Sequence, residues 1–96
     1  MMDKITDEKL DKYFEVTGRA LKKIKFSSPD KTHLNSVSKD YYDMAKRYYE
    51  DAKHFKENKD YVNAFAALNY AHGWLDAGAR LGIFDVDHDS VLFTVD

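Results

Sequence analysis

Apolar residues recur at helical spacing in three long segments of the chain, and the first of these is residues 6–25. Thr6 is a good N-cap, and the acidic residues Asp7 and Glu8 follow it in the first turn, where anions complement the helix dipole. Gly18, a poor helix former in mid-segment, indicates a close contact with another helix. The segment predicts one amphipathic helix, whose apolar stripe is Leu10, Tyr13, Phe14, Thr17, Leu21 and Ile24.

The second and third segments, residues 36–58 and 60–81, are separated by a very short polar break. Because connections this short join antiparallel neighbours, the two segments predict a long helical hairpin. Asp60 is expected to cap the third helix, and Gly82 is expected to end it. The apolar positions of the second segment alternate by three and four, as in a seam between packed helices: Tyr41, Met44, Ala45, Tyr48, Ala52 and Phe55.

Polar and turn-forming residues separate the first helix from the second. Pro29 stops the first helix, and Ser28 is placed to cap a short helical turn after it. The second helix is expected to begin near Ser36 or Ser38. The predicted fold is therefore all-α, a single domain in which a three-helix bundle is built on the long antiparallel hairpin.

The third segment is apolar nearly all the way round, which indicates that it is covered on most sides. Two neighbouring helices, or a second copy of the protein, would cover it. The C-terminal tail, residues 83–96, is acidic at first and then β-prone from Val91 to Val95. Three interpretations of the tail stay open: it docks on the bundle, adds as a strand to a partner's edge, or stays mobile, since a lone strand is only marginally stable.

Composition narrows the class of protein. The 96 residues suffice for one domain. The absence of cysteine excludes disulfides, thiolate zinc sites and cysteine nucleophiles, and it fits a reducing compartment. No apolar run reaches the roughly 18 residues of a membrane helix, and the N-terminus lacks the apolar stretch of a signal peptide. We therefore expect a soluble, cytoplasmic protein without a membrane partner.

Charge is balanced, with 15 basic against 17 acidic residues and a net charge of −2. A dedicated nucleic-acid binder normally shows a clearly basic face, so the charge balance disfavours nucleic acid as a partner. Lys22, Lys23 and Lys25 are interpreted as a solvated helix end in preference to a phosphate-binding patch. Arg47 and His54 satisfy the Arg-x6-His spacing of HEPN-type ribonucleases, but two common residues at this spacing arise easily by chance.

Four polar residues stand at near-helical spacing in the apolar third segment: Asn69, His72, Asp76 and Arg80. Their steps of three and four place them on one face of the helix. They form either a polar seam that fixes the helix packing or a groove for a polar or anionic ligand. In such a groove, Asp76 would orient the imidazole ring of His72 as a general base. No serine or cysteine nucleophile stands at a matching position, so no catalytic residue is assigned.

The register of the hairpin supplies partners for this seam. If the chain turns at Asn58, residues whose numbers add up to about 117 lie opposite each other. Asp76 is then beside Tyr41 and Tyr42, and Arg80 is beside the start of the second helix. The seam interpretation predicts that Asp76 accepts a hydrogen bond from a tyrosine hydroxyl and pairs with Arg80.

The acidic tail contains part of a calcium-loop pattern. Asp85, Asp87 and Asp89 occupy the first, third and fifth places, but Ser90 stands where the loop needs glycine. We interpret this stretch as an acidic turn, and we expect no metal and no cofactor.

Residues 41–84 resemble a known family. The residues that carry the resemblance are DYVNAF, beginning at Asp60, and NYAHGWLDAGARLG, beginning at Asn69. They are similar to the short archaeal proteins of domain-of-unknown-function family 357. The resemblance implies a compact helical bundle of about this length, and it implies no activity and no catalytic residue.

The leading hypothesis for function is a small non-enzymatic helical protein that acts as a protein-interaction or self-association module. Its partner would be another protein or a second copy in a homo-oligomer. Two alternatives stay open. One is a nucleic-acid-associated accessory protein with a HEPN-like helical bundle, and the other is a small polar ligand bound in a groove at His72, Asp76 and Arg80.

Overall fold

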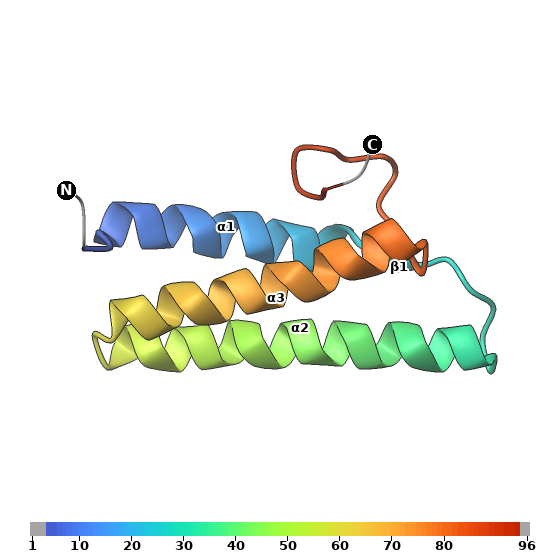
Figure 1. Cartoon of the computed structure of the whole chain (residues 1–96), viewed down its shortest axis with the longest axis horizontal. Helices are drawn as coiled ribbons and strands as arrows, with labels where there is room; N and C mark the ends of the chain where they lie inside the picture. Colours follow the sequence, from blue (N-terminus) through green and yellow to red (C-terminus); the bar gives the residue numbers. More distant parts are fainter. Residues whose placement is uncertain (1–3, 95–96) are drawn as a thin grey trace.

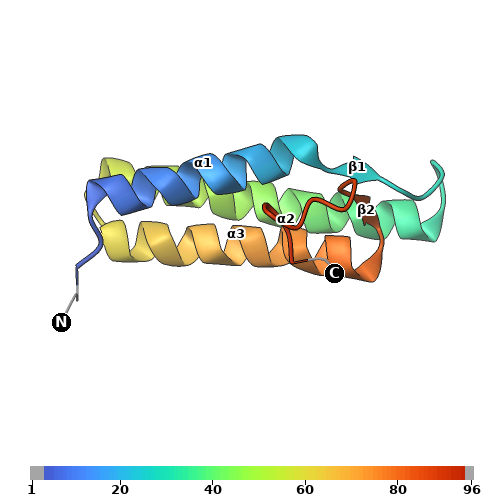
Figure 2. The ribbon, with the colours of Figure 1, turned by 90° about the horizontal axis from the view of Figure 1, so that it is seen from above.

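Three long helices dominate the computed structural model, which describes residues 4–94. Helix α1 spans Asp7–Lys23, α2 spans His33–Glu57 and α3 spans Tyr61–Leu81. Helices α2 and α3 form an antiparallel hairpin, and α1 packs along it in the same direction as α3 (Figures 1 and 2). The predicted all-α three-helix architecture is confirmed.

The predicted helix caps are confirmed at three of the helix ends. The Thr6 hydroxyl accepts a hydrogen bond from the Lys9 backbone N–H at 3.1 Å, and the Asp60 carboxylate accepts one from the Asn63 N–H at 3.3 Å. Gly82 ends α3 in the left-handed conformation, with φ of 87°, which glycine adopts without strain. Local side-chain chemistry therefore sets these boundaries.

The predicted start of α2 is wrong. The helix begins at His33, several residues before Ser36, because the Thr32 hydroxyl accepts a hydrogen bond from the Asn35 N–H at 3.2 Å and caps it there. The same hydroxyl donates to the Pro29 carbonyl oxygen at 2.7 Å. Pro29 therefore lies in the turn that positions the cap, and no separate helical turn is capped by Ser28.

Helix α1 ends at Lys23 because the residues that follow pair with the segment after α3. Strand β1, Lys25–Phe26, runs antiparallel to β2, Phe84–Asp85, with Lys25 opposite Asp85 and Phe26 opposite Phe84. This two-residue ladder ties the loop after α1 to the end of α3.

The tail docks on the bundle, which selects one of the three open interpretations. Residues 86–94 form turns and contain no strand, so the predicted β-run at Val91 is wrong within the described residues; Val95 lies outside them. Leu92 and Phe93 are only 5% and 3% exposed. The loop lies over α3 beside α1 (Figures 1 and 2).

Two apolar clusters form the core. One lies near the α2–α3 turn and is built by helices alone, with Leu10 and Leu68 almost fully buried. At the other end of the bundle the tail supplies most of the buried residues, which are Ala20, Ala45, Leu75, Ile83, Phe84, Val86, Leu92 and Phe93. The tail thus packs beside α1 on the C-terminal half of α3.

Glycines permit two close contacts in this core. The ring of Phe84 packs directly on Gly78, and a Cβ atom at position 78 would overlap with it. At Gly18, a Cβ atom would lie 2.9 Å from the Tyr49 hydroxyl oxygen, which confirms the predicted close contact between α1 and another helix. Neither position has room for a larger side chain.

Candidate functional site

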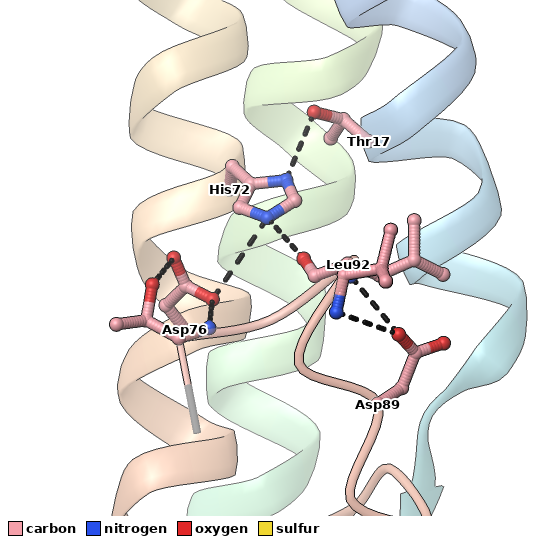
Figure 3. Close-up of polar contacts among 7 residues, drawn as sticks. Thr17, His72, Asp76, Asp89 and Leu92 are labelled. Carbon is pink, nitrogen blue, oxygen red and sulfur yellow. Dashed lines mark hydrogen bonds and ion pairs between the residues drawn. The ribbon is translucent and has the colours of Figure 1, made fainter. Parts of the chain in front are cut away.

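His72 and Asp76 hold the C-terminal loop against α3 (Figure 3). His72 Nε2 lies 2.6 Å from the Leu92 carbonyl oxygen, and its Nδ1 lies 3.1 Å from the Thr17 hydroxyl. Because a carbonyl oxygen only accepts, Nε2 carries a proton, and in the neutral ring Nδ1 accepts from Thr17. Both ring nitrogens are therefore engaged, which leaves no free nitrogen for a general base.

Asp76 completes this clasp, by which we mean His72 and Asp76 together with their contacts to the loop. Its two carboxylate oxygens accept from the Thr94 backbone N–H at 2.8 Å and from the Thr94 hydroxyl at 3.0 Å. His72 Nε2 is 3.8 Å from the nearer carboxylate oxygen. The loop occupies the place at which the sequence left open a groove for a polar ligand.

Asp89 shapes the loop that the clasp holds. Its carboxylate accepts from the backbone N–H groups of Val91 and Leu92, each at 3.0 Å (Figure 3). Asp85 accepts in the same way from the Asp87 N–H at 3.0 Å. These acidic residues thus form turns, and residues 4–94 contain no group of three or more His, Cys, Asp or Glu side chains placed to hold a metal ion.

The four residues of the predicted stripe do not share one site. Asn69 and Arg80 are exposed, whereas His72 and Asp76 are half-buried beneath the loop. Arg80 lies beside the β2 turn near Asp87, and no ion pair joins it to Asp76 within residues 4–94. The predicted partners of Asp76 are wrong, because its side of α3 faces the loop and α1 instead of α2.

The tyrosines of α2 contact other aromatic rings. Tyr41 meets Trp74 edge-on with ring centroids 5.0 Å apart, and Tyr48 stacks on Tyr70 at 5.2 Å. The numbers of these pairs add up to 115 and 118, so the predicted hairpin register near 117 is confirmed. Tyr42 points to the other side of α2, toward Phe26.

An apolar groove runs along the exposed side of the hairpin, and we call it the α2–α3 groove. Its volume is about 700 Å³. No charged residue lines it; the lining residues are Tyr48, Ala66, Asn69, Tyr70, Gly73, Trp74 and Ala77. The groove is therefore an apolar surface whose side-chain polar groups are the Asn69 amide, the indole N–H of Trp74 and two tyrosine hydroxyls.

The HEPN-like pair is exposed and engaged locally. Arg47 pairs with Asp43 at 2.8 Å, and His54 lies 3.9 Å from Glu57. Both side chains are more than 70% exposed, so they line no pocket of their own.

Within residues 4–94, no helix combines the length and the apolar character that a membrane span requires.

The chain matches the model of one protein family over residues 12–84, and that family is described as Protein of unknown function (DUF357). The chain belongs to this family. The DUF357 match runs from α1 to Phe84 and so confirms the resemblance seen in residues 41–84, while the loop held by the clasp lies beyond it. No curated protein matches the chain, and no solved structure does.

Within the DUF357 match, α2 carries a seven-residue repeat that was not among the predicted features. The pattern Lys-x-Tyr-Tyr-acidic-x-Ala occurs twice, as KDYYDMA and KRYYEDA, and a third lysine follows at Lys53. In each copy the alanine is fully buried, the first tyrosine meets an aromatic ring of α3, and the second faces α1 or β1. The repeated tyrosine pair is the signal that would have revealed two different grooves, one on each side of α2.

Proposed function

We propose that this protein is a non-enzymatic interaction module that associates with a second copy of itself through the outward face of α3. The observation that carries the proposal is the exposure of large apolar side chains on this face. Val62, Tyr70 and Leu81 are 64%, 63% and 62% exposed, although they belong to the most apolar helix of the chain. Contiguous exposed apolar surface of this kind marks interaction sites in soluble proteins.

Small residues lie between these large ones. Ala66, Gly73 and Ala77 are exposed along the same face, and a Cβ atom built at Gly73 meets nothing within 4 Å. Small residues allow the backbone of another helix to approach closely. The surface is therefore suited to a helix more than to a flat sheet or a loop.

The pattern on α3 is complementary to itself. When two copies of α3 cross antiparallel about a two-fold axis, residues whose numbers add up to 143 face each other. Tyr70 then meets Gly73 of the second copy, Ala66 meets Ala77, and Val62 meets Leu81, so a large side chain fills the space over the glycine. A two-fold interface requires this kind of self-complementary patch.

Charge and area both favour a second copy. The lining of the α2–α3 groove carries no charge, so nothing on the common axis repels an identical surface. Helix α3 has 21 residues, which at 1.5 Å each make about 31 Å, and two adjacent helices make a face about 20 Å wide. The resulting 600 Å² or so per partner approaches the roughly 800 Å² of a standard stable interface.

Two further parts of the proposal follow from composition and from the clasp. A cytoplasmic location is supported by the absence of cysteine. The absence of an enzymatic role is supported by the clasp, since both nitrogens of His72 are engaged in holding the loop.

Sedimentation equilibrium from 1 to 500 μM tests the proposal. We expect the wild-type chain to be dimeric at high concentration and Ala77→Glu to be monomeric, because each copy would place a carboxylate against the apolar Ala66 of the other copy. Ser36→Glu adds the same charge at an exposed position away from α3 and should dimerise like the wild type. A wild-type chain that stays monomeric at 500 μM, or an equal effect of both variants, would contradict self-association through this face.

A further inference from the structure

A second groove lies between α1 and α2, on a different side of α2 from the α2–α3 groove, and we call it the α1–α2 groove. Its volume is about 720 Å³. Leu21 of α1, Ile24 at its C-cap and Phe26 of β1 supply apolar lining. Tyr42 and Tyr49, the second tyrosines of the two repeats, line the groove from α2. The groove does not involve the self-association face, so a ligand bound in it is independent of the proposed function.

Lysines converge on this groove. Lys22 reaches it from α1, and two lysines reach it from α2: Lys46, which begins the second repeat, and Lys53, which follows that repeat. Glu50 is the only acidic residue in the lining, and it lies 3.5 Å from the Lys53 ammonium. The groove thus holds three positive charges against one negative charge in a chain whose net charge is −2.

Two of these ammonium groups have no carboxylate partner in the part of the chain that the structure describes. Within residues 4–94, the ion pairs of lysine are those of Lys53 with Glu50 and of Lys56 with Asp11, so neither Lys22 nor Lys46 has one. Unpaired lysines on opposite walls of an apolar groove leave positive potential that an anion would neutralise. Lysine binds phosphate as a point charge with three donors.

The aromatic walls provide for the rest of a ligand. Tyr42 packs edge-on against Phe26 with ring centroids 6.2 Å apart, and Tyr49 packs edge-on against Phe14 at 5.7 Å. Gly18 gives Tyr49 its position, because the Tyr49 hydroxyl oxygen lies where a side chain on α1 would begin. Tyr42 and Tyr49 are half-buried, so each ring keeps accessible surface. Apolar walls with a few convergent charges are typical of small-molecule sites.

We propose that the α1–α2 groove binds a small phosphate-bearing ligand with a flat apolar ring, of nucleotide size. The phosphate contacts Lys22 and Lys46, and the ring lies against Tyr42 and Tyr49. The volume falls within the roughly 300–1,000 Å³ of small-molecule pockets. The negative net charge of the chain disfavours a long nucleic-acid strand, which needs an extended basic surface.

Calorimetric titration and mapping of backbone amide shifts by NMR test this proposal with ADP as the probe, at 50 mM salt. We expect ADP to bind and to shift amide signals around the groove, while adenosine and inorganic pyrophosphate, each with half of the recognised chemistry, bind more weakly. A ten-residue oligouridylate distinguishes a free nucleotide from a nucleic-acid strand as the source of the phosphate and ring.

The groove variant is the double substitution Lys22→Gln and Lys46→Gln. Its control is the double substitution Lys12→Gln and Lys59→Gln, which removes the same charge from exposed sites outside the groove. The groove variant should weaken ADP binding about tenfold or more through the loss of two charge-assisted contacts. The control should leave it unchanged.

Several results would overturn the proposal. They are no ADP binding at 50 mM salt, an equal loss in both variants, or pyrophosphate binding as tightly as ADP. If oligouridylate binds more than tenfold tighter than ADP and shifts amide signals well outside the groove, the ligand is a single-stranded nucleic acid and the proposal of a small ligand is wrong.

Discussion

Replacing Phe93 by alanine should strongly destabilise the protein, although this residue lies near the end of the described chain. The ring is 3% exposed and belongs to the apolar cluster in which the loop covers α3. Removing it loses roughly 2–3 kcal/mol of transfer free energy and leaves a cavity, and core Phe→Ala substitutions cost about 3–5 kcal/mol in total. Because the loop can shift to fill part of the cavity, we expect about 3 kcal/mol.

Such a loss is large for a domain of this size, whose free energy of unfolding is of the order of 5–15 kcal/mol. A fall of about 3 kcal/mol corresponds to a decrease in Tm of roughly 12 °C or more for a domain of 60–100 residues. Urea titration at low protein concentration, followed by circular dichroism and by the fluorescence of Trp74, measures the change. The same experiment reports on the clasp, since the loop carries the carbonyl that His72 binds.

The control is Val91→Ala in the same loop. Val91 is 86% exposed, so its truncation should change the free energy of unfolding by less than about 0.5 kcal/mol. If Phe93→Ala and Val91→Ala agree within that margin, the loop contributes nothing to the core, and His72 and Asp76 do not hold it against α3 in solution.

Three further predictions test the packing and the α2 cap by thermal and urea unfolding. Gly78→Ala should lower the free energy of unfolding by about 1–3 kcal/mol, because the new methyl group overlaps with the Phe84 ring packed on it from β2. The control Gly73→Ala should be neutral or stabilising by up to about 1 kcal/mol, since its methyl group meets open space. Equal effects of the two substitutions would refute this contrast. Gly18→Ala should cost about 1 kcal/mol or more in the wild type and less in a Tyr49→Phe background, where the hydroxyl that it would meet is absent; strictly additive costs would count against the contact. Thr32→Ala should lower the free energy of unfolding by about 1 kcal/mol through the loss of the α2 cap, and an unchanged stability would show that α2 begins elsewhere.

Helices, their direction and most of their caps were predictable because each depends on residues close together in the sequence. Asp60 and Gly82 begin or end a helix through their own side-chain or backbone chemistry. The start of α2 was not predictable, since Thr32 and Ser36 are both good caps and the choice depends on how the preceding loop is tied down by β1.

The tail was harder, because its sequence favours a strand while its structure is a set of turns. Asp85 and Asp89 bond to nearby backbone N–H groups and divert the chain from an extended form. Burial of Leu92 and Phe93 then offsets the cost of ordering the loop. Only the space left open beside α3 decides that this burial is available.

The candidate site shows the same division. Helical periodicity alone determined that His72 and Asp76 lie on one face of α3, and the length of the turn determined the hairpin register. Which surface that face meets depended on how α1 and the tail pack around the hairpin, because contacts between segments far apart in sequence are chosen by shape and burial and leave no local pattern. The sequence by itself therefore determined the helices and their pairing, and only the tertiary structure decided that the polar pair of α3 holds the tail and that the tyrosine repeat of α2 lines two separate grooves.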